Sequence, residues 1–273
     1  MPPRRKKTKA PKEPDFSYDH STLVSCIQKH YQLLIDMAYL DAQSVRWPPA
    51  PAGWSDSELN VDALRKLDRN ETVIELLRHI PYTGDRTTEV YYATMATSYL
   101  REHWEPEKTS DSNWYRKEFC ALGLAPFDGP MPPHLITLTN EESEIGITWI
   151  VDTERGCIYP HGEDYYLFDD EPPEVEDEGM WWLKVKGMEF EEFFDKIHHD
   201  IWSLLLVPVP VADDRCLNIK GSGDREYKVV KDLYRKYGWP ITFRKDEFLP
   251  AAVAAREKII RTARAQLAAE DEE

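Results

Sequence analysis

The chain has 273 residues, of which 41% are hydrophobic and 12% aromatic, and its formal net charge at pH 7 is −16. This composition excludes an intrinsically disordered chain, because disordered chains lack the large apolar residues that build a core. The negative charge disfavours nucleic acid and anionic membranes as partners of the folded part, because both are polyanions.

The charge is divided unevenly between a short basic start and the rest of the chain. Residues 1–14 hold six of the 34 Lys and Arg residues and one of the 50 acidic residues. Residues 15–273 therefore contain 28 basic and 49 acidic residues, a net charge of −21. Residues 1–14 offer almost nothing to bury, so we expect a disordered tail, compatible with nuclear localisation or with nonspecific nucleic-acid contact. Folding of this tail onto the protein's own acidic loop is an alternative.

Cysteine spacing and hydropathy indicate a cytoplasmic or nuclear protein. The four cysteines lie far apart, without a CxxC motif: Cys26, Cys120, Cys157 and Cys216. We expect reduced thiols. The start of the chain has no apolar segment of the kind that a secretory signal requires, and the longest apolar stretch, 204–211, is short and contains two prolines. We therefore predict no membrane span.

The first third of the chain predicts helices separated by proline. Apolar residues at helical spacing predict an amphipathic helix from Ser21 to about Arg46, ended by the proline-rich segment 47–53. Ser55 and Glu58 match a capping box, which predicts that a helix starts there. We expect Asn70 to cap the next helix, which ends at a proline. Residues 87–104 lack a clean period, so helix and strand both remain open there.

The middle of the chain predicts an antiparallel meander. Residues 135–139, 145–151 and 157–159 are short runs rich in β-branched and aromatic residues, with turn residues between them. We expect residues 180–185 to add another strand.

The last third predicts three helices. Five apolar residues at helical spacing place the first one against the sheet: Phe190, Phe194, Ile197, Ile201 and Leu205. The second covers residues 224–237, with Gly238 at its end. The third runs over residues 250–268 and carries an apolar stripe: Leu249, Val253, Ile260, Ala263 and Leu267.

Together these elements predict an α+β fold in which an antiparallel meander sheet is flanked by helices, with N- and C-terminal helical regions. The expected organisation is a disordered basic tail over 1–14, an N-terminal helix and proline-rich linker over 15–50, an α+β core over 51–212 and a C-terminal helical region over 213–273.

We find no complete catalytic or metal-binding motif, and predict no catalytic residue, no metal and no cofactor. The best histidine clusters are His161 with Glu163 and Asp164, and the adjacent pair His198 and His199. Neither has the i, i+4 spacing that places two ligands on one helical face. Adjacent helical residues diverge by about 100°, so the two histidines of the pair should point apart.

One loop concentrates acidic residues. Nine acidic residues lie between positions 163 and 178: Glu163, Asp164, Asp169, Asp170, Glu171, Glu174, Glu176, Asp177 and Glu178. They form either a solvated loop or a docking surface for a Lys/Arg-rich segment. Beside them, Trp181 and Trp182 would face opposite sides of a strand, so one of the two is a candidate exposed aromatic residue.

Three motifs occur in an order that resembles a known group of proteins. Helices close with residues 77–82 (Leu-Arg-His-Ile-Pro-Tyr), the meander contains residues 147–159, and residues 189–194 (Glu-Phe-Glu-Glu-Phe-Phe) open a helix. This order resembles the SUKH superfamily, which includes fungal cell-wall assembly regulators and bacterial toxin-immunity proteins. The stretch 67–77 is also similar to a segment of uncharacterised fungal proteins.

The resemblance covers about residues 55–205. It departs from the family at residues 83–85, where this chain has Thr-Gly-Asp and the family usually has Asn-Gly. It implies an α+β fold that binds other proteins and carries no catalytic residues.

We therefore expect a non-enzymatic interaction or regulatory module that presents an acidic surface to a basic segment of a partner protein. One alternative is a hydrolase or transferase of unfamiliar type that uses His161, Glu163 and Asp164. Another is a structural subunit of a larger assembly, held by the last helix.

Overall fold

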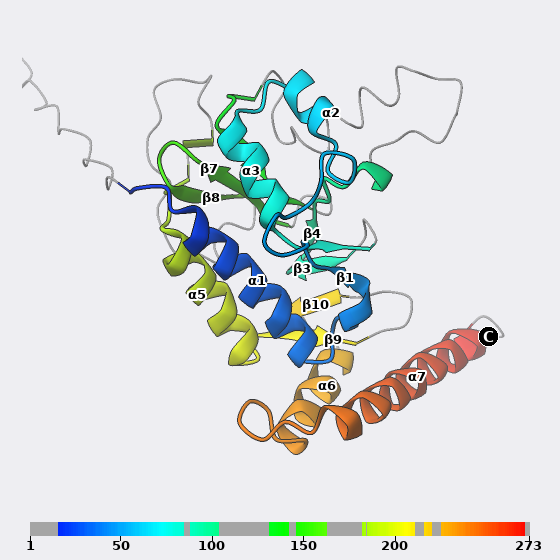
Figure 1. The fold of residues 1–273 in the computed structure, drawn as a ribbon. Helices are drawn as coiled ribbons and strands as arrows, with labels where there is room; N and C mark the ends of the chain where they lie inside the picture. The colour runs from blue at the N-terminus through cyan, green and yellow to red at the C-terminus, as the bar shows by residue number, and fades with distance from the viewer. Residues whose placement is uncertain are drawn as a thin grey trace, which may run out of the picture.

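The computed structural model describes residues 16–84, 88–103, 131–141, 146–162, 182–183, 185–210, 216–219 and 225–270. Figure 1 shows helices packed around several small antiparallel sheets. The predicted α+β class is confirmed, with helices toward both ends of the chain. Within the described ranges, no helix is long and apolar enough to cross a membrane.

The first helix, α1 (His20–Asp36), starts where predicted but ends well before Arg46. Asp19 caps it, because its carboxylate accepts a 3.0 Å hydrogen bond from the N–H of Thr22. Ala38 then adopts a left-handed conformation with φ of 61°, which ends the helix. The apolar residues that follow are buried by tertiary packing, so their spacing does not mark a helix.

The capping-box prediction is wrong about the position of the helix start. The N–H of Ser55 does donate to the carboxylate of Glu58 at 3.0 Å. The chain nevertheless makes a turn here, since Leu59 forms a β-bridge with Leu100. The helix α2 (Val61–Lys66) begins only after this bridge.

The next helix, α3 (Glu71–His79), has the predicted cap. The side-chain oxygen of Asn70 accepts a 2.8 Å hydrogen bond from the N–H of Val73. Pro81 follows the helix, as expected from the sequence.

The predicted meander is confirmed as a three-stranded antiparallel sheet in the order β5-β7-β8. Its strands are β5 (Leu135–Thr137), β7 (Thr148–Asp152) and β8 (Cys157–His161). The further strand expected over 180–185 is wrong for the described residues of that segment, because Trp182, Leu183 and Val185 lie outside any strand.

The segment that the sequence left open, 87–104, forms strands and a short 3₁₀ helix. Its elements are β3 (Glu89–Tyr91), β4 (Thr94–Ala96) and η2 (Arg101–His103). A sheet of order β3-β4-β6 includes β6 (Thr139–Glu141). Two further antiparallel pairs join β1 (Val45–Arg46) to β2 (Tyr82–Thr83) and β9 (Leu206–Val209) to β10 (Cys216–Ile219). The short 3₁₀ helix η1 (Ala42–Ser44) precedes β1.

The predicted sheet-packing helix is α5 (Phe190–Trp202). It lies beside α1, and the two helices run in the same direction (Figure 1). Leu205 was expected on its apolar face but lies beyond the helix and is 39% exposed. Phe193, which was not among the predicted apolar residues of this face, is buried. The core therefore covers a wider face of α5 than the predicted stripe.

The C-terminal helices are α6 (Arg225–Lys236) and α7 (Lys245–Glu270). Tyr234 of α6 stacks on Phe248 of α7, with ring centroids 4.2 Å apart. Gly238 has a positive φ of 91° at the turn between them, as the sequence predicts. Figure 1 shows the last part of α7 pointing away from the body of the molecule.

The described residues form two hydrophobic clusters, one on each face of the β5-β7-β8 sheet. The larger cluster joins residues of α1, α3, α5, α6 and α7 with one face of the sheet, including Trp149 and Val151. The smaller cluster lies on the other face and includes Ile150 and Trp182. This alternation along β7 is that of a strand buried on both sides.

Candidate interaction surface

α1 and α5 begin at a shared hollow of about 180 Å³. Three carboxylates line it, those of Asp19, Glu189 and Glu191. The aromatic residues Phe16 and Phe190 form part of its wall. The hollow therefore combines negative charge with apolar surface.

Gly156 allows the N-terminal segment to reach this place. It lies in the turn between β7 and β8 with φ of 70°, a conformation that favours glycine. A Cβ atom at this position would collide with the backbone of Ser17 and Tyr18. The segment before α1 therefore lies directly on this turn, which brings Asp19 toward the start of α5.

The three acidic residues of the hollow lie at the surface of the molecule. All three residues are exposed. None of the ion pairs between described residues involves them. Hydrogen bonds from the Ser21 hydroxyl and the Thr22 N–H lower the pKa of Asp19. The N-terminal ends of two helices also favour negative charge here.

The negative charge continues along α5. Glu192 and Asp195 are exposed on this helix beyond Glu191. We refer to five residues together as the acidic surface: Asp19, Glu189, Glu191, Glu192 and Asp195. All of them except Asp195 lie at or near a helix start, which is the one sequence signal that would have pointed to them.

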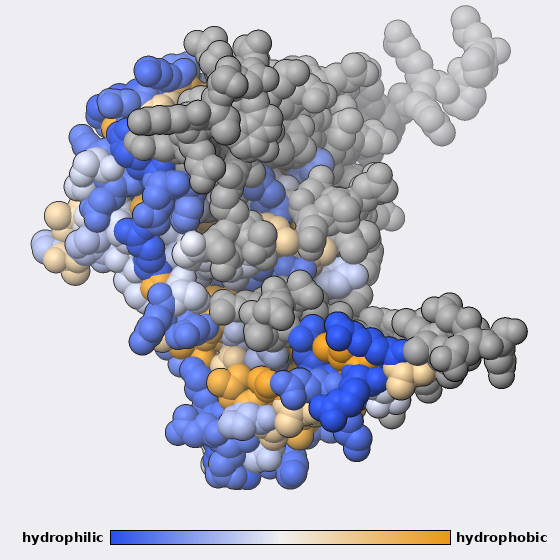
Figure 2. Space-filling model, turned by 90° about the vertical axis from the view of Figure 1, so that its right-hand side faces the viewer, coloured by the Kyte–Doolittle hydropathy of each residue, from blue (hydrophilic) through white to orange (hydrophobic). Residues whose placement is uncertain are grey.

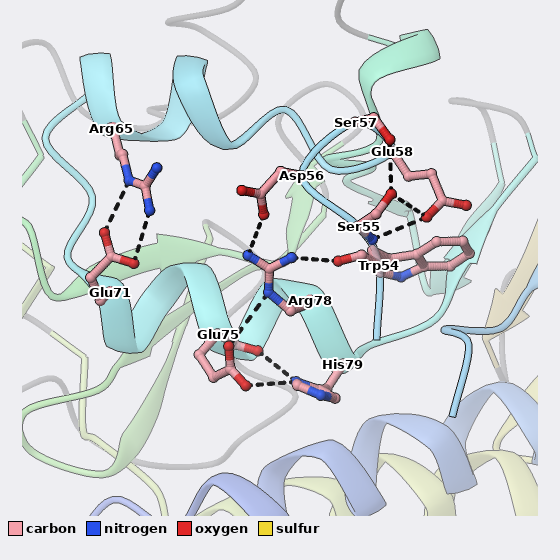
Figure 3. A network of polar contacts seen from close by, with 10 residues as sticks. All are labelled: Trp54, Ser55, Asp56, Ser57, Glu58, Arg65, Glu71, Glu75, Arg78 and His79. Carbon is pink, nitrogen blue, oxygen red and sulfur yellow. Dashed lines mark hydrogen bonds and ion pairs between the residues drawn. The ribbon is translucent and has the colours of Figure 1, made fainter. Parts of the chain in front are cut away.

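A second group of charged residues, around α2 and α3, is internally paired (Figure 3). Arg78 contacts Asp56 at 2.8 Å and Glu75 at 3.5 Å. Arg65 makes two contacts with Glu71, at 3.0 and 3.3 Å. Each of these two arginines therefore has a carboxylate partner. The contact between Asp56 and Arg78 joins the segment before α2 to α3.

Two histidines, the buried His30 and the partly buried His198, lie between α1, α5 and the sheet. His30 is fully buried, and its Nε2 donates to the carbonyl oxygen of Val90 at 2.7 Å. Its ring packs edge-on against Trp149. Burial is the main cause that lowers the pKa of His30 to about 3 and that of His198 to about 4. Both rings are therefore neutral at pH 7 and belong to the packed core, away from the hollow.

The sequence prediction that His198 and His199 point apart is confirmed. His198 packs inward, with its ring 5.9 Å from that of Phe194, whereas His199 is exposed. Sequence analysis assigned no role to His30, although its helical spacing from Ile27 already placed it on the apolar face of α1.

The sequence-predicted binding residues lie largely outside the described ranges. This applies to all nine acidic residues of 163–178 and to Trp181. Trp182 is 7% exposed, because it packs into the smaller cluster with Tyr159 and Val185. Of the two tryptophans, Trp181 therefore remains the candidate exposed aromatic residue.

The alternative enzyme site is described only in part. His161 ends β8 and is partly buried, whereas Glu163 and Asp164 lie outside the described ranges. Within the ranges that the structure covers, no three His, Cys, Asp or Glu residues are grouped so that they would hold a metal ion.

Comparison with known proteins gives no match, whether to protein-family models, to curated proteins or to solved structures. What this chain does must therefore be inferred from its own residues.

Proposed function

We propose that this protein is a non-enzymatic interaction module that holds a Lys/Arg-rich segment of a partner protein on its acidic surface. The observation that carries this proposal is the meeting of Asp19, Glu189 and Glu191 at one hollow. The charge of −21 over residues 15–273 supports it, because a field of this sign attracts basic segments over a distance.

The chemistry of the hollow suits a basic side chain. The stems of lysine and arginine are apolar and pack against surfaces such as Phe16, while their charged ends interact with carboxylates. With about 180 Å³, the hollow is smaller than the roughly 300–1,000 Å³ of typical ligand pockets. It fits a single side chain of a bound segment better than a small-molecule substrate.

The resemblance to the SUKH superfamily remains part of this proposal. Its members include proteins that bind other proteins. The acidic loop 163–178 adds nine acidic residues to the chain, and we propose that it also contacts the basic segment.

A peptide-binding measurement tests the location of the site. The probe is a fluorescein-labelled deca-lysine peptide, and the readout is fluorescence anisotropy with the full chain. We expect the triple variant Asp19→Asn/Glu189→Gln/Glu191→Gln to bind the peptide about tenfold more weakly, a loss of about 1.4 kcal/mol. Asparagine keeps a capping oxygen at position 19, so α1 should remain capped.

The matched control separates a specific site from overall charge. Asp62→Asn/Asp232→Asn/Asp246→Asn changes the net charge by the same amount at exposed positions away from the hollow. We expect this control to bind like the unmodified chain at an ionic strength of about 0.15 M, where the Debye length is about 8 Å. Equal weakening by both triple variants would mean that only bulk charge matters and would refute the site.

The contribution of the loop is measured separately. Asp169→Asn/Asp170→Asn/Glu171→Gln removes the same number of charges from the acidic loop. Weaker binding in this variant would support a role of the loop beside the hollow. Binding that is unaltered would restrict the proposal to the acidic surface.

A further inference from the structure

The turn between α6 and α7 is an uncharged segment rich in aromatic residues, with basic residues on both sides. Residues 237–243 read Tyr-Gly-Trp-Pro-Ile-Thr-Phe. Arg235 and Lys236 precede them, and Arg244 and Lys245 follow them. We call residues 237–243 the tip and the four basic residues the collar. Residues 235–245 therefore carry four positive charges and no negative charge, in a chain whose net charge is −16.

Apolar side chains at the tip and beside it are exposed to solvent. Ile241 is 90% exposed. Trp202, the last residue of α5, is 51% exposed, although its ring packs edge-on against that of Trp239 with centroids 5.3 Å apart. Figure 2 shows orange hydrophobic surface among blue hydrophilic surface in the lower part of the molecule, at the height of α6 in Figure 1. Large apolar residues that are exposed together mark an interaction surface.

Backbone hydrogen bonds hold the tip in this shape. The N–H of Thr242 donates to the carbonyl oxygen of Gly238 at 2.8 Å, and the N–H of Arg244 donates to that of Tyr237 at 2.8 Å. Ile241 therefore projects from a closed turn. Burial of its side chain requires no prior ordering of the backbone, which lowers the entropic cost of binding.

The collar lies at the base of the tip. The ammonium group of Lys236 and the guanidinium of Arg244 both lie over the ring of Tyr237, at 5.2 and 5.6 Å from its centroid. Asp232 and Glu247 pair with the two arginines of the collar at 3.6 and 2.9 Å, but these pairs are at the surface, where ion pairs are weak. The arginines can therefore exchange these partners for another anion.

We propose that the tip inserts into the headgroup region of a membrane that contains anionic phospholipids, with the collar on the phosphate groups. Ile241 and the two tryptophan rings enter the boundary between headgroups and acyl chains, where tryptophan is favoured. The collar residues bury their apolar stems and keep their charged ends at the phosphates. The protein then lies on the membrane without crossing it.

The arrangement favours a lipid surface over a pocket in another protein. An isoleucine that is 90% exposed on a projecting turn has to be surrounded on nearly all sides before it leaves water. A bilayer surrounds it without a preformed cavity, because lipids rearrange around an inserted side chain. Positive charge on both sides of the tip also matches a surface that is negative in every direction.

The negative charge of the whole chain does not act at the tip. Trp202 ends α5, and Lys245 donates to the carbonyl oxygen of Ile35 near the end of α1 at 2.6 Å, whereas the acidic surface lies where these helices start. The 17 residues of α1 separate the two places by about 25 Å at 1.5 Å per residue. The Debye length at 0.15 M salt is about 8 Å, so the acidic surface is screened.

The charge near the tip has the opposite sign. Residues 225–247 form α6, the tip and the start of α7, and they contain seven basic and four acidic residues, a net charge of +3. A membrane in contact with the tip therefore meets a positive part of the molecule. This contact is independent of the acidic surface, so the triple variant Asp19→Asn/Glu189→Gln/Glu191→Gln should still bind membranes.

Sedimentation of the full chain with vesicles tests the proposal. The probes are vesicles of phosphatidylcholine alone and vesicles with about 30% phosphatidylserine, at about 0.15 M salt. We expect the chain to sediment only with the anionic vesicles. Ile241→Ser should weaken this binding about tenfold, because it removes the side chain that inserts. The control Trp47→Ser removes an exposed apolar residue outside the tip and should leave binding unchanged.

The role of the collar is tested with a matched pair of variants. Arg235→Gln/Lys236→Gln should weaken binding to the anionic vesicles about tenfold. Arg65→Gln/Lys66→Gln removes an adjacent exposed arginine and lysine from α2, which lies far from the tip in Figure 1, and should bind like the unmodified chain. Equal weakening by both variants would mean that bulk charge alone acts and would refute the site.

Fluorescence quenching shows whether the tip enters the membrane. Phosphatidylcholine that is brominated close to its headgroup quenches tryptophan at the boundary, so we expect quenching by anionic vesicles that contain it, and less quenching in Trp202→Phe. Absence of binding to anionic vesicles, or binding that Ile241→Ser does not weaken, would overturn the proposal. So would a chain that binds a fluorescein-labelled deca-glutamate peptide but no vesicle, because the tip would then serve an acidic protein segment.

Discussion

His30 of α1 and His198 of α5 stack face to face, with ring centroids 5.3 Å apart and ring planes 7° from parallel. Neither His30 Nδ1 nor His198 Nε2 has a hydrogen-bond partner among the described residues. Two imidazoles in such contact cannot both be charged without strong repulsion in a medium of low dielectric constant. The stacking therefore excludes the state in which both rings are protonated, and burial keeps each ring neutral at pH 7.

This pair predicts a loss of stability in mild acid. The folded-state pKa values are about 3 for His30 and about 4 for His198, below the ordinary value of 6.5. The unfolded chain therefore binds protons first, and the free energy of unfolding falls as pH decreases below about 6.5, by up to about 1.4 kcal/mol per pH unit for the fully buried ring. The loss should continue until pH approaches the folded values. Urea unfolding between pH 7 and pH 4.5 measures it.

The histidine origin of this loss is tested by substitution. His30→Gln keeps an N–H donor for the carbonyl of Val90 but does not titrate, so the dependence of stability on pH should become shallower over this range. His199→Gln removes an exposed histidine from the same helix as His198 and serves as the matched control. If His30→Gln and the unmodified chain lose stability with the same slope, the stacked pair does not control the acid response. Carboxylates contribute equally to both proteins and cancel in the comparison.

Arg69 is a second buried group on which the fold should depend. It is 5% exposed, and among the described residues its guanidinium donates to backbone carbonyl groups alone, those of Leu67, Met131, Pro132 and Leu135. We expect Arg69→Met to lower the free energy of unfolding by at least about 3 kcal/mol, because each buried carbonyl left unpaired costs about 1–3 kcal/mol. Chemical denaturation measures this loss.

The comparison with Arg65 and with lysine sharpens this prediction. Arg65 forms its ion pair with Glu71 at the surface, where water screens the charges, so Arg65→Met should cost much less stability than Arg69→Met. Arg69→Lys should recover only part of the lost stability, since an ammonium group does not reproduce the planar fork of donors. A lysine variant as stable as the unmodified chain would show that charge alone, without this geometry, is sufficient.

Gly156→Ala should destabilise the chain and disturb the hollow. The left-handed conformation alone costs a residue with a Cβ atom about 1–2 kcal/mol, and the collision with the backbone of Ser17 and Tyr18 adds to it. Thermal unfolding measures the loss. Gly84→Ala is the control, because its added Cβ would lie at an ordinary 3.4 Å from the carbonyl oxygen of Ser44. Similar effects of the two substitutions would contradict a special role of this turn.

Asn70→Ala should cost about 1 kcal/mol of unfolding free energy, because it removes the side-chain acceptor for the N–H of Val73 at the start of α3. Asn70→Asp should keep most of that stability, since aspartate caps as well as asparagine. Urea denaturation distinguishes the two. Equal losses for alanine and aspartate would show that the cap bond contributes little.

Local patterns in the sequence were sufficient for α3, for the three strands of the meander, and for α5 and α6. Asn70 capped the predicted helix, the turn residues around Gly156 separated the predicted strands, and Gly238 ended α6 as expected. These features depend on residues within a few positions of one another, so the local sequence is sufficient to produce them. The helix that was expected to reach Arg46 ends at Asp36 instead, because Ala38 adopts a left-handed conformation that turns the chain. The apolar residues after Ala38 are buried by tertiary packing.

The candidate site was only partly accessible to sequence analysis. The negative charge of the body and the acidic loop followed from counting residues, and the loop's role stays a prediction. Asp19 and Glu189 are far apart in the chain, and each looked like an ordinary acid at a helix start. Their meeting depends on α1 lying beside α5 and on Gly156 admitting the segment before α1.

By itself, the sequence determined the α+β class, the meander, the apolar face of α5 and the strong acidity of the chain, because spacing, turn residues and charge are local or additive properties. Only the tertiary structure decided that His30 is buried against His198, that Trp182 is covered, and that the carboxylates of Asp19, Glu189 and Glu191 share one hollow. These outcomes depend on which elements pack together, and packing brings together residues whose separation along the chain contains no signal of their contact.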